Sequence, residues 1–575
     1  MNGNFWLLCM ALQLVGLTSS AQTTDPQQVA QLVANRIVEE CAFDFIKKPI
    51  ATRQEYSWYF DYQNMPASAS TNTHYVISEL VFQKESESAA AYQLAVSHTA
   101  GRMVIKIGEQ TFESTTENDH QLIRQDYELL DFLTYFSLSK VKKTEKTPLP
   151  VSVYFYPTKD TQPSFWIGFV EADSRMTTRQ LSLQNPLWAT ASTAFAVRPK
   201  AQQGVVSDLP PMLPATPLVH HFPSRLNFTD WRYYTGTFLT AMNDVTNHFG
   251  TLDQSPFIEQ HLQFFYKNKD KIAAENHATG RLSGPFTLYF RNKMLDDFGP
   301  QGTAVLHYLD RKYGNDLAGM QQDPFYSILE NILDNIQNKV ARLKDGTLVR
   351  ITPDTSTVQS DDLFMAGLPL IRAAKVLQRP ELLEDAVTQS LNFHKYLYNE
   401  QTELYHHAYF TWSNEQSCCH WGRGMGWMMM IYVELLHALP DNHPQRPTIL
   451  KNYRAVCSGL LRYQNEDGRW HQIITDPNTY LETSATAMFV RALAEGCTNK
   501  WFTKKERKKM RAAAQLGWSG LCSKLEKDGQ VMGIVRGTPI FETANQYANW
   551  NTRPNDPRGL GAVLWAAIAM DKLLK

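Results

Sequence analysis

The 575-residue sequence has almost no net charge, few cysteines and, after residue 21, no apolar run long enough to cross a membrane. Lysine and arginine total 56 and aspartate and glutamate total 57, which gives a formal net charge of −1 at pH 7. This balance gives no electrostatic indication of nucleic acid or of an anionic membrane surface as a partner. The seven cysteines lack zinc-ligand spacing, so no metal site is predicted. A hydrophobic content of 43% still predicts a sizeable core.

The first 21 residues have the pattern of a targeting segment. Residues 5–17 are mostly apolar, and residues 18–21 are small enough for a cleavage site, although the segment lacks an initial lysine or arginine. We interpret residues 1–21 as a signal peptide and expect an exported protein, periplasmic or secreted. Export permits disulfides. The adjacent Cys418 and Cys419 and the other cysteines are therefore either bridged or buried free thiols.

Residues 22–48 carry a predicted helix, from about Pro26 to Glu40, because apolar residues recur there at helical spacing. The apolar face consists of Val29, Leu32, Val33 and Ile37.

Residues 49–225 have a β-rich texture. Short β-branched and aromatic segments alternate with polar turns, which predicts a mostly β, sandwich-like module. One helix is predicted within it, over residues 121–136, and a proline-rich linker ends it. No catalytic constellation stands out here. The predicted strands are 74–82, 92–96, 102–107, 151–156 and 165–170.

Helices dominate residues 226–575. Alternate helices follow loops rich in polar and aromatic residues, which is typical of an α/α barrel whose inner helices present their N-terminal ends to one face. Six inner helices need six outer ones, and the helix at 26–40 supplies the outer one that is otherwise missing. The fold class is therefore predicted to be mainly α, with an inserted or N-terminal mostly β module. The predicted helix starts lie near Trp231, Ser255, Pro300, Pro324, Asp361, Glu381, Trp421, Pro444, Glu482, Lys504 and Arg558.

Residues 404–440 gather the most binding candidates at one junction between a loop and a helix. The loop carries His407 and Tyr409, and the helix begins with Trp421 and Arg423. Alternating glycines at this helix start allow close approach of backbone or ligand. Aromatic faces beside an arginine suit a sugar ring that carries a carboxylate.

Seven stretches between residues 228 and 575 occur in a recognisable order. They read LDDFGPQGTAVLHYLDRKYG, SDDLFMAGLPLIRAA, LYHHAY, WGRGMGWMMMIYVELLHALP, GRWHQ, YLETSATAMFVRALAEG and PNDPRGLGAVLWAAIAM. In this order they resemble glycoside hydrolase family 105, the unsaturated rhamnogalacturonyl and glucuronyl hydrolases, and more distantly family 88. The resemblance implies an (α/α)6 barrel. It also implies an exo-acting hydrolase, without cofactor, that removes a 4,5-unsaturated uronic acid from oligosaccharides made by polysaccharide lyases.

The resemblance implies two catalytic carboxylates. Asp361 in DDLFM matches the family's catalytic aspartate, with Asp362 as the competing position, and we expect Asp361 to donate the proton and to help deprotonate water. Asp296 in LDDFG matches the second aspartate, while either Asp296 or Asp297 is expected to cap the following helix. A capping role is also open for Asp361, since Ser and Asp are favoured N-caps. The predicted substrate-binding residues are His407, Trp421, Arg423, Trp231, His471 and Tyr409.

Two other functions remain open. One is an exo-glycosidase that acts on saturated uronic acids through paired carboxylates. The other is a non-catalytic glycan-binding protein in which the β-rich module is the working part. The sequence does not identify the uronate, the aglycone or the oligomeric state.

Overall fold

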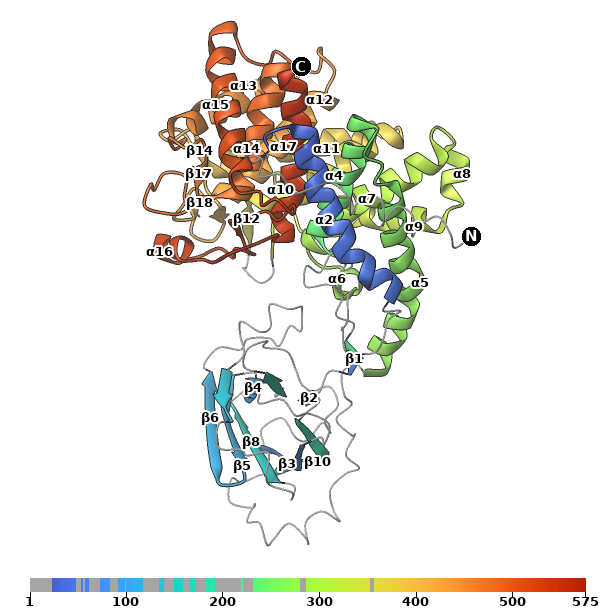
Figure 1. Ribbon diagram of the computed structural model, residues 1–575, viewed down its shortest axis with the longest axis vertical. Helices are drawn as coiled ribbons and strands as arrows, with labels where there is room; N and C mark the ends of the chain where they lie inside the picture. The colour runs from blue at the N-terminus through green and yellow to red at the C-terminus, as the bar shows by residue number, and fades with distance from the viewer. Residues whose placement is uncertain are drawn as a thin grey trace. The chain divides into compact units, whose positions relative to one another are not determined.

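The computed structural model contains a helix-rich and a strand-rich unit, which are described separately (Figure 1). The first comprises Met1–Ala42, Arg232–Gln260 and Lys293–Lys575, and the second comprises Phe43–Trp231 and His261–Asn292. The predicted signal peptide lies outside the described residues. The structure describes residues 23–47, 53–54, 57–60, 73–82, 92–98, 100–116, 134–138, 149–158, 165–171, 181–191, 219–220, 231–279, 286–351 and 356–575.

Six helices of the first unit pack side by side in a closed ring (Figure 1). They are α4 (Tyr233–Phe249), α7 (Leu295–Tyr313), α10 (Ser360–Val376), α12 (Gly422–Ala438), α14 (Thr483–Thr498) and α17 (Pro557–Leu574). Each packs against the next, and α17 closes the ring against α4. The ring provides the inner layer that the alternating helices predicted.

An outer layer of helices packs against this ring. Helix α9 lies on α7, α11 on α10, α13 on α12 and α15 on α14. The other helices of this unit are α8 (Leu317–Gln321), α9 (Pro324–Asp334), the π-helix Asn335–Lys339, α11 (Pro380–Leu397), α13 (Arg446–Arg462), α15 (Lys504–Cys522) and α16 (Ala544–Ala548). Helix α2 (Pro26–Lys47) belongs to this unit up to Ala42 and α5 (Ser255–Thr279) up to Gln260, whereas α6 (Thr287–Arg291) belongs to the second unit.

The start of α7 differs from the prediction. The helix begins at Leu295 rather than near Pro300, because Asp297 accepts hydrogen bonds from the backbone N–H groups of Lys293 (2.9 Å) and Met294 (3.0 Å). A carboxylate that satisfies free N–H groups at a helix start stabilises the helix by about 1 kcal/mol. The other predicted helices begin within two residues of their expected starts.

Helix α2 extends beyond its predicted end at Glu40. Gln27 donates to Thr251 at the end of α4 (2.9 Å), and the indole of Trp518 in α15 donates to the carbonyl of Thr24 (2.8 Å). Side chains further along α2 contact the loop after α15, where Arg36 pairs with Asp528 (2.9 Å). The described part of α2 is therefore held between the end of α4 and α15.

Two inner helices approach very closely where α7 meets α10. A Cβ atom added at Gly299 would lie 2.0 Å from the carbonyl oxygen of Met365. No larger residue fits there without movement of the backbone, so this contact fixes the relative position of the two helices. These helices carry the two predicted catalytic aspartates.

A buried charge network joins four inner helices. Arg372 of α10 donates to Asp244 of α4 (3.1 Å) and to Glu434 of α12 (2.7 Å). Arg491 of α14 also pairs with Glu434, whose side chain is 6% exposed. Removing one partner would leave a buried charge unpaired, which typically costs about 3–5 kcal/mol.

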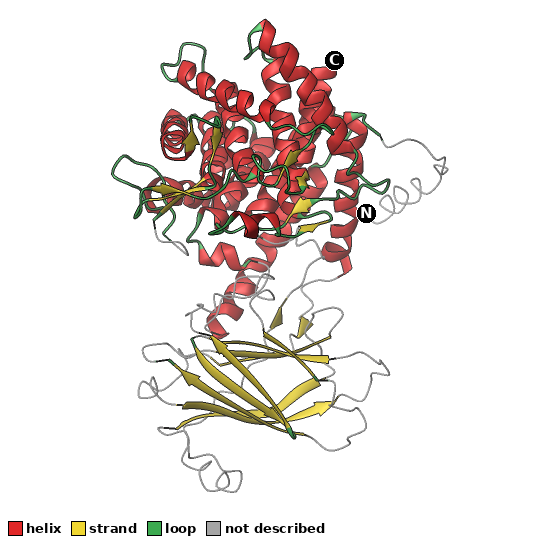
Figure 2. Ribbon diagram, turned by 90° about the vertical axis from the view of Figure 1, so that its left-hand side faces the viewer, coloured by secondary structure: helices red, strands yellow, loops and turns green. Residues whose placement is uncertain are grey.

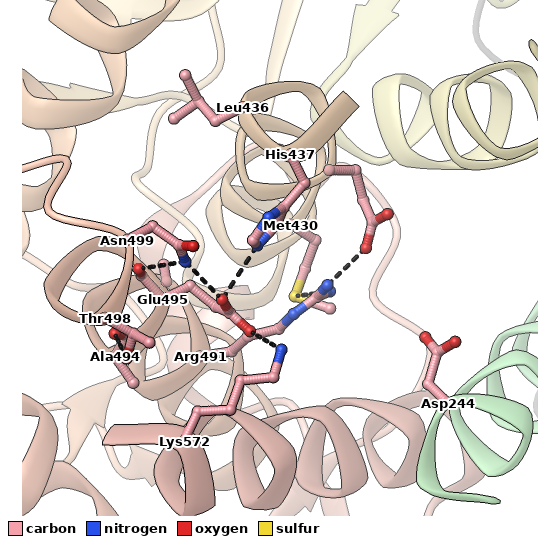
Figure 3. Close-up of polar contacts among 12 residues, drawn as sticks. Asp244, Met430, Leu436, His437, Arg491, Ala494, Glu495, Thr498, Asn499 and Lys572 are labelled. Atoms are coloured by element: carbon pink, nitrogen blue, oxygen red, sulfur yellow. Dashed lines mark hydrogen bonds and ion pairs between the residues drawn. The ribbon is translucent and has the colours of Figure 1, made fainter. Parts of the chain in front are cut away.

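A second carboxylate, Glu495 of α14, lies among three donors (Figure 3). It accepts from His437 (3.0 Å), from the side chain of Asn499 (3.0 Å) and from Lys572 (3.1 Å). Burial opposes ionisation, but the hydrogen bond from His437 and the charge of Lys572 outweigh it and lower the pKa of Glu495 to about 2. The contacts of Glu495 with His437 and Lys572 therefore join α14 to α12 and α17.

Among its described residues, the second unit contains two larger antiparallel sheets, seen face to face in Figure 2, and the two-stranded pair β1-β11. One has the strand order β10-β3-β8-β5-β6 and the other β2-β9-β4-β7. Alternate apolar residues of β4, β5, β8 and β9 form one shared core. The strands are β1 (Arg53–Gln54), β2 (Ser57–Phe60), β3 (Thr73–Phe82), β4 (Tyr92–His98), β5 (Gly101–Ile107), β6 (Gln110–Thr116), β7 (Thr134–Ser137), β8 (Leu149–Pro157), β9 (Phe165–Glu171), β10 (Leu181–Ala191) and β11 (Val219–His220).

The predicted helix at 121–136 is wrong at its C-terminal end. Thr134–Ser137 is strand β7, which pairs with β4 along Phe136↔Leu94. Tertiary pairing with an apolar strand outweighs the local helical spacing here. The rest of that predicted helix lies outside the described residues.

Candidate active site

Short hairpins position the segments that lead into the inner helices. Strand β12 pairs with β15 through Gln359↔Ala408, and the N–H of Ser360 donates to the carbonyl of His407 (2.9 Å). This pairing brings the start of α10 beside His407. The small strands of the first unit are β12 (Thr357–Gln359), β13 (Tyr398–Asn399), β14 (Leu404–Tyr405), β15 (Ala408–Phe410), β16 (Glu415–Gln416), β17 (Trp470–His471), β18 (Leu481–Glu482), β19 (Ile534–Val535) and β20 (Thr552–Arg553).

Asp361 lies in the first turn of α10 and faces His407. The Nε2 atom of His407 is 3.4 Å from Oδ2 of Asp361, whose side chain is 18% exposed. Burial opposes ionisation of Asp361, but the hydrogen bond with His407 and the guanidinium groups of Arg350 and Arg423 lower its pKa. Asp361 is therefore a stable carboxylate that still reaches the surface of the site.

Arg350 is a site residue that the sequence analysis missed. Its Nε lies 3.2 Å from Oδ2 of Asp362, its Nη2 contacts Oδ1 of the same carboxylate, and Nη2 also lies 3.3 Å from Oδ1 of Asp296. The backbone of Arg350 pairs with Thr357 through two hydrogen bonds, which places the side chain beside the start of α10. The bidentate contact occupies Asp362, whose side chain is 4% exposed. Asp362 is therefore the ion-pair partner, and Asp361 is the carboxylate that faces His407.

Asp296 has the opposite electrostatic character to Asp361. Burial raises its pKa to about 6, with Arg350 opposing this effect and the neighbouring carboxylates of Asp362 and Asp361 adding to it. The adjacent Asp297 is the capping residue, which leaves Asp296 for the site. Two carboxylates whose surroundings separate their pKa values can act as an acid and a base near neutral pH.

Tyr233, in the first turn of α4, also belongs to this group. Burial raises the pKa of its phenol well above the ordinary value; the charges of Arg558 and Arg423 oppose this effect, while those of Asp296 and Asp361 add to it. The side chain is only partly covered. It therefore offers a neutral O–H donor near both aspartates, although the sequence analysis did not name it as a site residue.

Trp421 and Arg423 have different surroundings from those predicted. Trp421 is 1% exposed, and its ring packs against His407 (4.3 Å between centroids) and under the guanidinium of Arg423 (5.1 Å). Arg423 is equally buried and donates to the carbonyls of Val535 and Arg536. A covered indole presents no open platform to a sugar, and two of the arginine's donors are already used. This packing favours support of His407 over direct substrate contact.

Three further predicted binding residues have partners of their own. His471 donates from Nδ1 to the carbonyl oxygen of Thr479, and Tyr409 donates to Asn414 (3.0 Å). Trp231 belongs to the second unit, where it is 1% exposed and packs on an aromatic pair. Trp231 and His471 are both buried, at 1% and 7% exposed, and their sugar contact stays a prediction. That aromatic pair is Phe265 and Tyr289.

The glycines at the start of α12 accommodate protein atoms. A Cβ at Gly424 would lie 2.5 Å from Oγ of Ser360 and 2.7 Å from the Trp421 ring, and one at Gly426 would lie 2.3 Å from the sulfur of Met488. Close helix packing therefore explains these glycines.

The six cysteines among the described residues are free thiols. Cys418 is exposed and its sulfur lies 3.1 Å from that of buried Cys419. Of the two alternatives left open by the sequence, the free thiol applies to these six. Within the described ranges, no cluster of three or more His, Cys, Asp or Glu side chains suits a metal ion, and no helix combines the length and apolarity needed to cross a membrane.

A model of a known family covers most of the helical unit. The model of Glycosyl Hydrolase Family 88 matches residues 218–574. The chain belongs to this family. The match confirms the predicted family relationship and includes Asp296, Arg350, Asp361 and His407, whereas most of the strand-rich unit lies outside it.

Two curated relatives of this family 88 protein are unsaturated-uronide hydrolases by name. The unsaturated rhamnogalacturonyl hydrolase YesR of Bacillus subtilis is 33% identical over 234 residues, which are 39% of this chain and 64% of that protein. An unsaturated 3S-rhamnoglycuronyl hydrolase of Alteromonas is 28% identical over 220 residues, which are 37% of this chain and 50% of that protein. The chain thus spans less than two thirds of the length of either relative.

A solved structure shares the fold. It is that of a possible member of glycoside hydrolase family 105 from Salmonella enterica, with a TM-score of 0.51 at 20% identity. The likeness covers 62% of this chain and 87% of that chain. It agrees with the mainly helical fold class predicted from the sequence.

Proposed function

We propose that the protein removes a 4,5-unsaturated uronic acid from the non-reducing end of lyase-generated oligosaccharides by hydration of the C4=C5 bond. The observation that carries the proposal is the pair of unlike carboxylates, Asp296 with its raised pKa and Asp361 with its lowered pKa. The names of the two relatives indicate the class of substrate.

The substrate determines what the site must do. A 4,5-unsaturated uronide is a vinyl ether, so a proton added at C4 leaves positive charge at C5 that the ring oxygen stabilises. Water then adds at C5 and gives a hemiketal, which opens and releases the aglycone. The reaction needs one group that donates a proton and one that accepts a proton from water.

The pKa directions favour Asp296 as the proton donor and Asp361 as the carboxylate that accepts a proton from water. This division keeps the water-deprotonating part of the role that the sequence analysis gave to Asp361 and moves proton donation to Asp296. His407 orients Asp361, and the neutral phenol of Tyr233 can donate to a substrate oxygen. Arg350 keeps both Asp296 and Asp362 in place.

The test is a panel of disaccharides produced by lyases from pectin, glycosaminoglycan and arabinogalactan, each beside its saturated counterpart. Hydration removes the ultraviolet absorbance of the conjugated C4=C5 bond, so loss of this absorbance with release of the aglycone is expected for at least one unsaturated member. Cleavage of saturated partners alone would replace the hydration mechanism with that of an ordinary exo-glycosidase. Binding without turnover of any member would favour a glycan-binding protein.

Export is part of the proposal. The apolar segment at residues 5–17 and the small residues that follow it are its only support. N-terminal sequencing of the mature protein from a fractionated host is expected to begin near residue 22. An intact N-terminus in the cytoplasmic fraction would refute the export.

A further inference from the structure

His407 contacts a different polar side chain through each ring nitrogen. Nδ1 lies 2.6 Å from the hydroxyl oxygen of Tyr547, and Nε2 lies 3.4 Å from Oδ2 of Asp361. His407 is 2% exposed and Tyr547, in α16, is 0% exposed. Asp361, His407 and Tyr547 thus form a chain of polar contacts, in which His407 and Tyr547 lie 140 residues apart in the sequence.

The direction of each hydrogen bond follows from the donors available. The backbone N–H of Phe541 donates to the hydroxyl oxygen of Tyr547 (3.2 Å), so that oxygen already accepts one hydrogen bond. Burial raises the pKa of the phenol well above its ordinary value, so Tyr547 keeps its single proton. Among the described residues, Nδ1 of His407 is the acceptor that this proton can reach.

A neutral histidine whose Nδ1 accepts a hydrogen bond must carry its proton on Nε2. We infer that Tyr547 is a positioning residue that fixes His407 as the Nε2–H tautomer and thereby directs its one donor at Asp361. An imidazolium would carry protons on both nitrogens and leave the Tyr547 proton without an acceptor.

Charged groups of both signs also lie around His407. Two aspartates and two arginines belong to these surroundings, but the contact that bears on Nδ1 itself is the one with Tyr547. Two thiols lie near Tyr547. The groups are Asp361 and Asp362 of α10, Arg350 before β12, Arg423 of α12, and Cys418 and Cys419.

The direct test is the protonation state of His407. Nitrogen-15 NMR of histidine-labelled protein, assigned with His407→Gln, is expected to show the Nε2–H tautomer of the neutral ring in the wild type. Tyr547→Phe keeps the ring that packs against Phe541 and Cys419 but removes the hydroxyl. His407 is then expected to become a mixture of the two neutral tautomers. An Nδ1–H tautomer in the wild type would overturn the inference, whatever the variant does.

The kinetic test rests on the proposed function. Tyr547→Phe is expected to lower kcat about tenfold, the effect of one lost hydrogen bond, and to leave KM near the wild-type value. A structural effect alone would leave the tautomer of His407 unchanged.

The matched control is Tyr453→Phe. Tyr453 is also 0% exposed, and its hydroxyl donates to the carbonyl of Ala492 (2.5 Å) in α14. It should lose comparable thermal stability while keeping the wild-type kcat and the Nε2–H tautomer of His407. Equal effects of the two variants on kcat and on the tautomer would refute the role of Tyr547. If the wild type hydrates no unsaturated uronide, the proposed function fails, and the tautomer measurement still decides this inference.

Discussion

Replacing Arg350 with methionine is expected to raise the pKa of the proton donor Asp296 and to shift the pH dependence of catalysis. Arg350 is the one cation with a direct contact to Asp296 in the described structure, with Nη2 3.3 Å from Oδ1. Methionine keeps much of the side-chain length and removes the charge. Asp362 would lose its bidentate partner in the same change.

The size of the shift follows from this contact. Two unit charges separated by 3.3 Å interact by about 5 kcal/mol at an effective dielectric constant of about 20, which sets an upper bound. Since Arg350 is shared between two carboxylates, we expect the usual effect of an arginine on a neighbouring aspartate, about 1–3 pKa units. The pKa of Asp296, about 6 with Arg350 present, should rise to about 7–9 without it.

The assay is kcat/KM for an unsaturated disaccharide as a function of pH. A proton donor loses activity as the pH rises through its pKa, so the basic limb should move up by the same 1–3 units or so in Arg350→Met. Arg350→Lys keeps the charge without the bidentate contact and should leave the limb near its wild-type position. An unmoved basic limb in Arg350→Met would refute the assignment of Asp296 as donor.

Folding must be separated from chemistry in this experiment. An unpaired Asp362 is expected to cost about 3–5 kcal/mol of stability. The double variant Arg350→Met with Asp362→Leu removes both charges and should recover much of that loss. Its basic limb should be displaced less than in Arg350→Met, because loss of the Asp362 carboxylate, which raises the pKa of Asp296, partly offsets the loss of the cation.

Three further predictions follow from the same contacts. Asp361→Asn should keep the fold and lower turnover by about 10²–10⁴-fold, whereas Asp362→Asn should mainly lower the thermal midpoint; equal losses of activity would contradict the assignment. Glu495→Gln should remove an acid-dependent part of stability: the pKa of Glu495 falls from 4.5 to about 2 on folding, so about 3 kcal/mol present above pH 4.5 is lost as the pH falls to about 2. Urea unfolding of both proteins between these pH values checks it, and parallel curves would refute it. Trp231→Ala should cost about 3–5 kcal/mol with KM unchanged, and a raised KM at full stability would support the predicted sugar contact.

The helical unit could be predicted from the sequence because its signals are local. Apolar residues at a 3.6-residue period define the helices, and cap residues such as Asp323 before Pro324 and Thr503 before Lys504 define their starts. The start predicted near Pro300 was misplaced. That prediction also used a local signal, because proline is favoured in the first turn of a helix. At α7 the reciprocal cap made by Asp297 begins the helix earlier and leaves Pro300 inside it.

The site could be predicted only where a motif marked it. Asp296, Asp361 and His407 come together as the family resemblance implied. Arg350 lies in an unremarkable TLVRIT segment, and a β-bridge to Thr357 brings it to the aspartates. Tyr547 is 140 residues from His407 in the sequence, and the two side chains meet only once the helical unit has folded. Contacts of this kind depend on how distant segments return to one place, which local patterns do not encode.

Helix geometry explains why Asp361 and Asp362 have different roles. At 3.6 residues per turn, neighbouring side chains point about 100° apart, so two adjacent carboxylates cannot face the same partner. Asp362 pairs with Arg350, which also contacts Asp296, and Asp361 contacts His407. The guanidinium of Arg350 thus limits how far burial raises the pKa of Asp296 on α7. The same group holds Asp362 on α10, so that Asp361 faces His407. A one-residue shift of α10 would exchange the partners, so the close contact between Gly299 and Met365 that locks α7 against α10 also protects the division between acid and base.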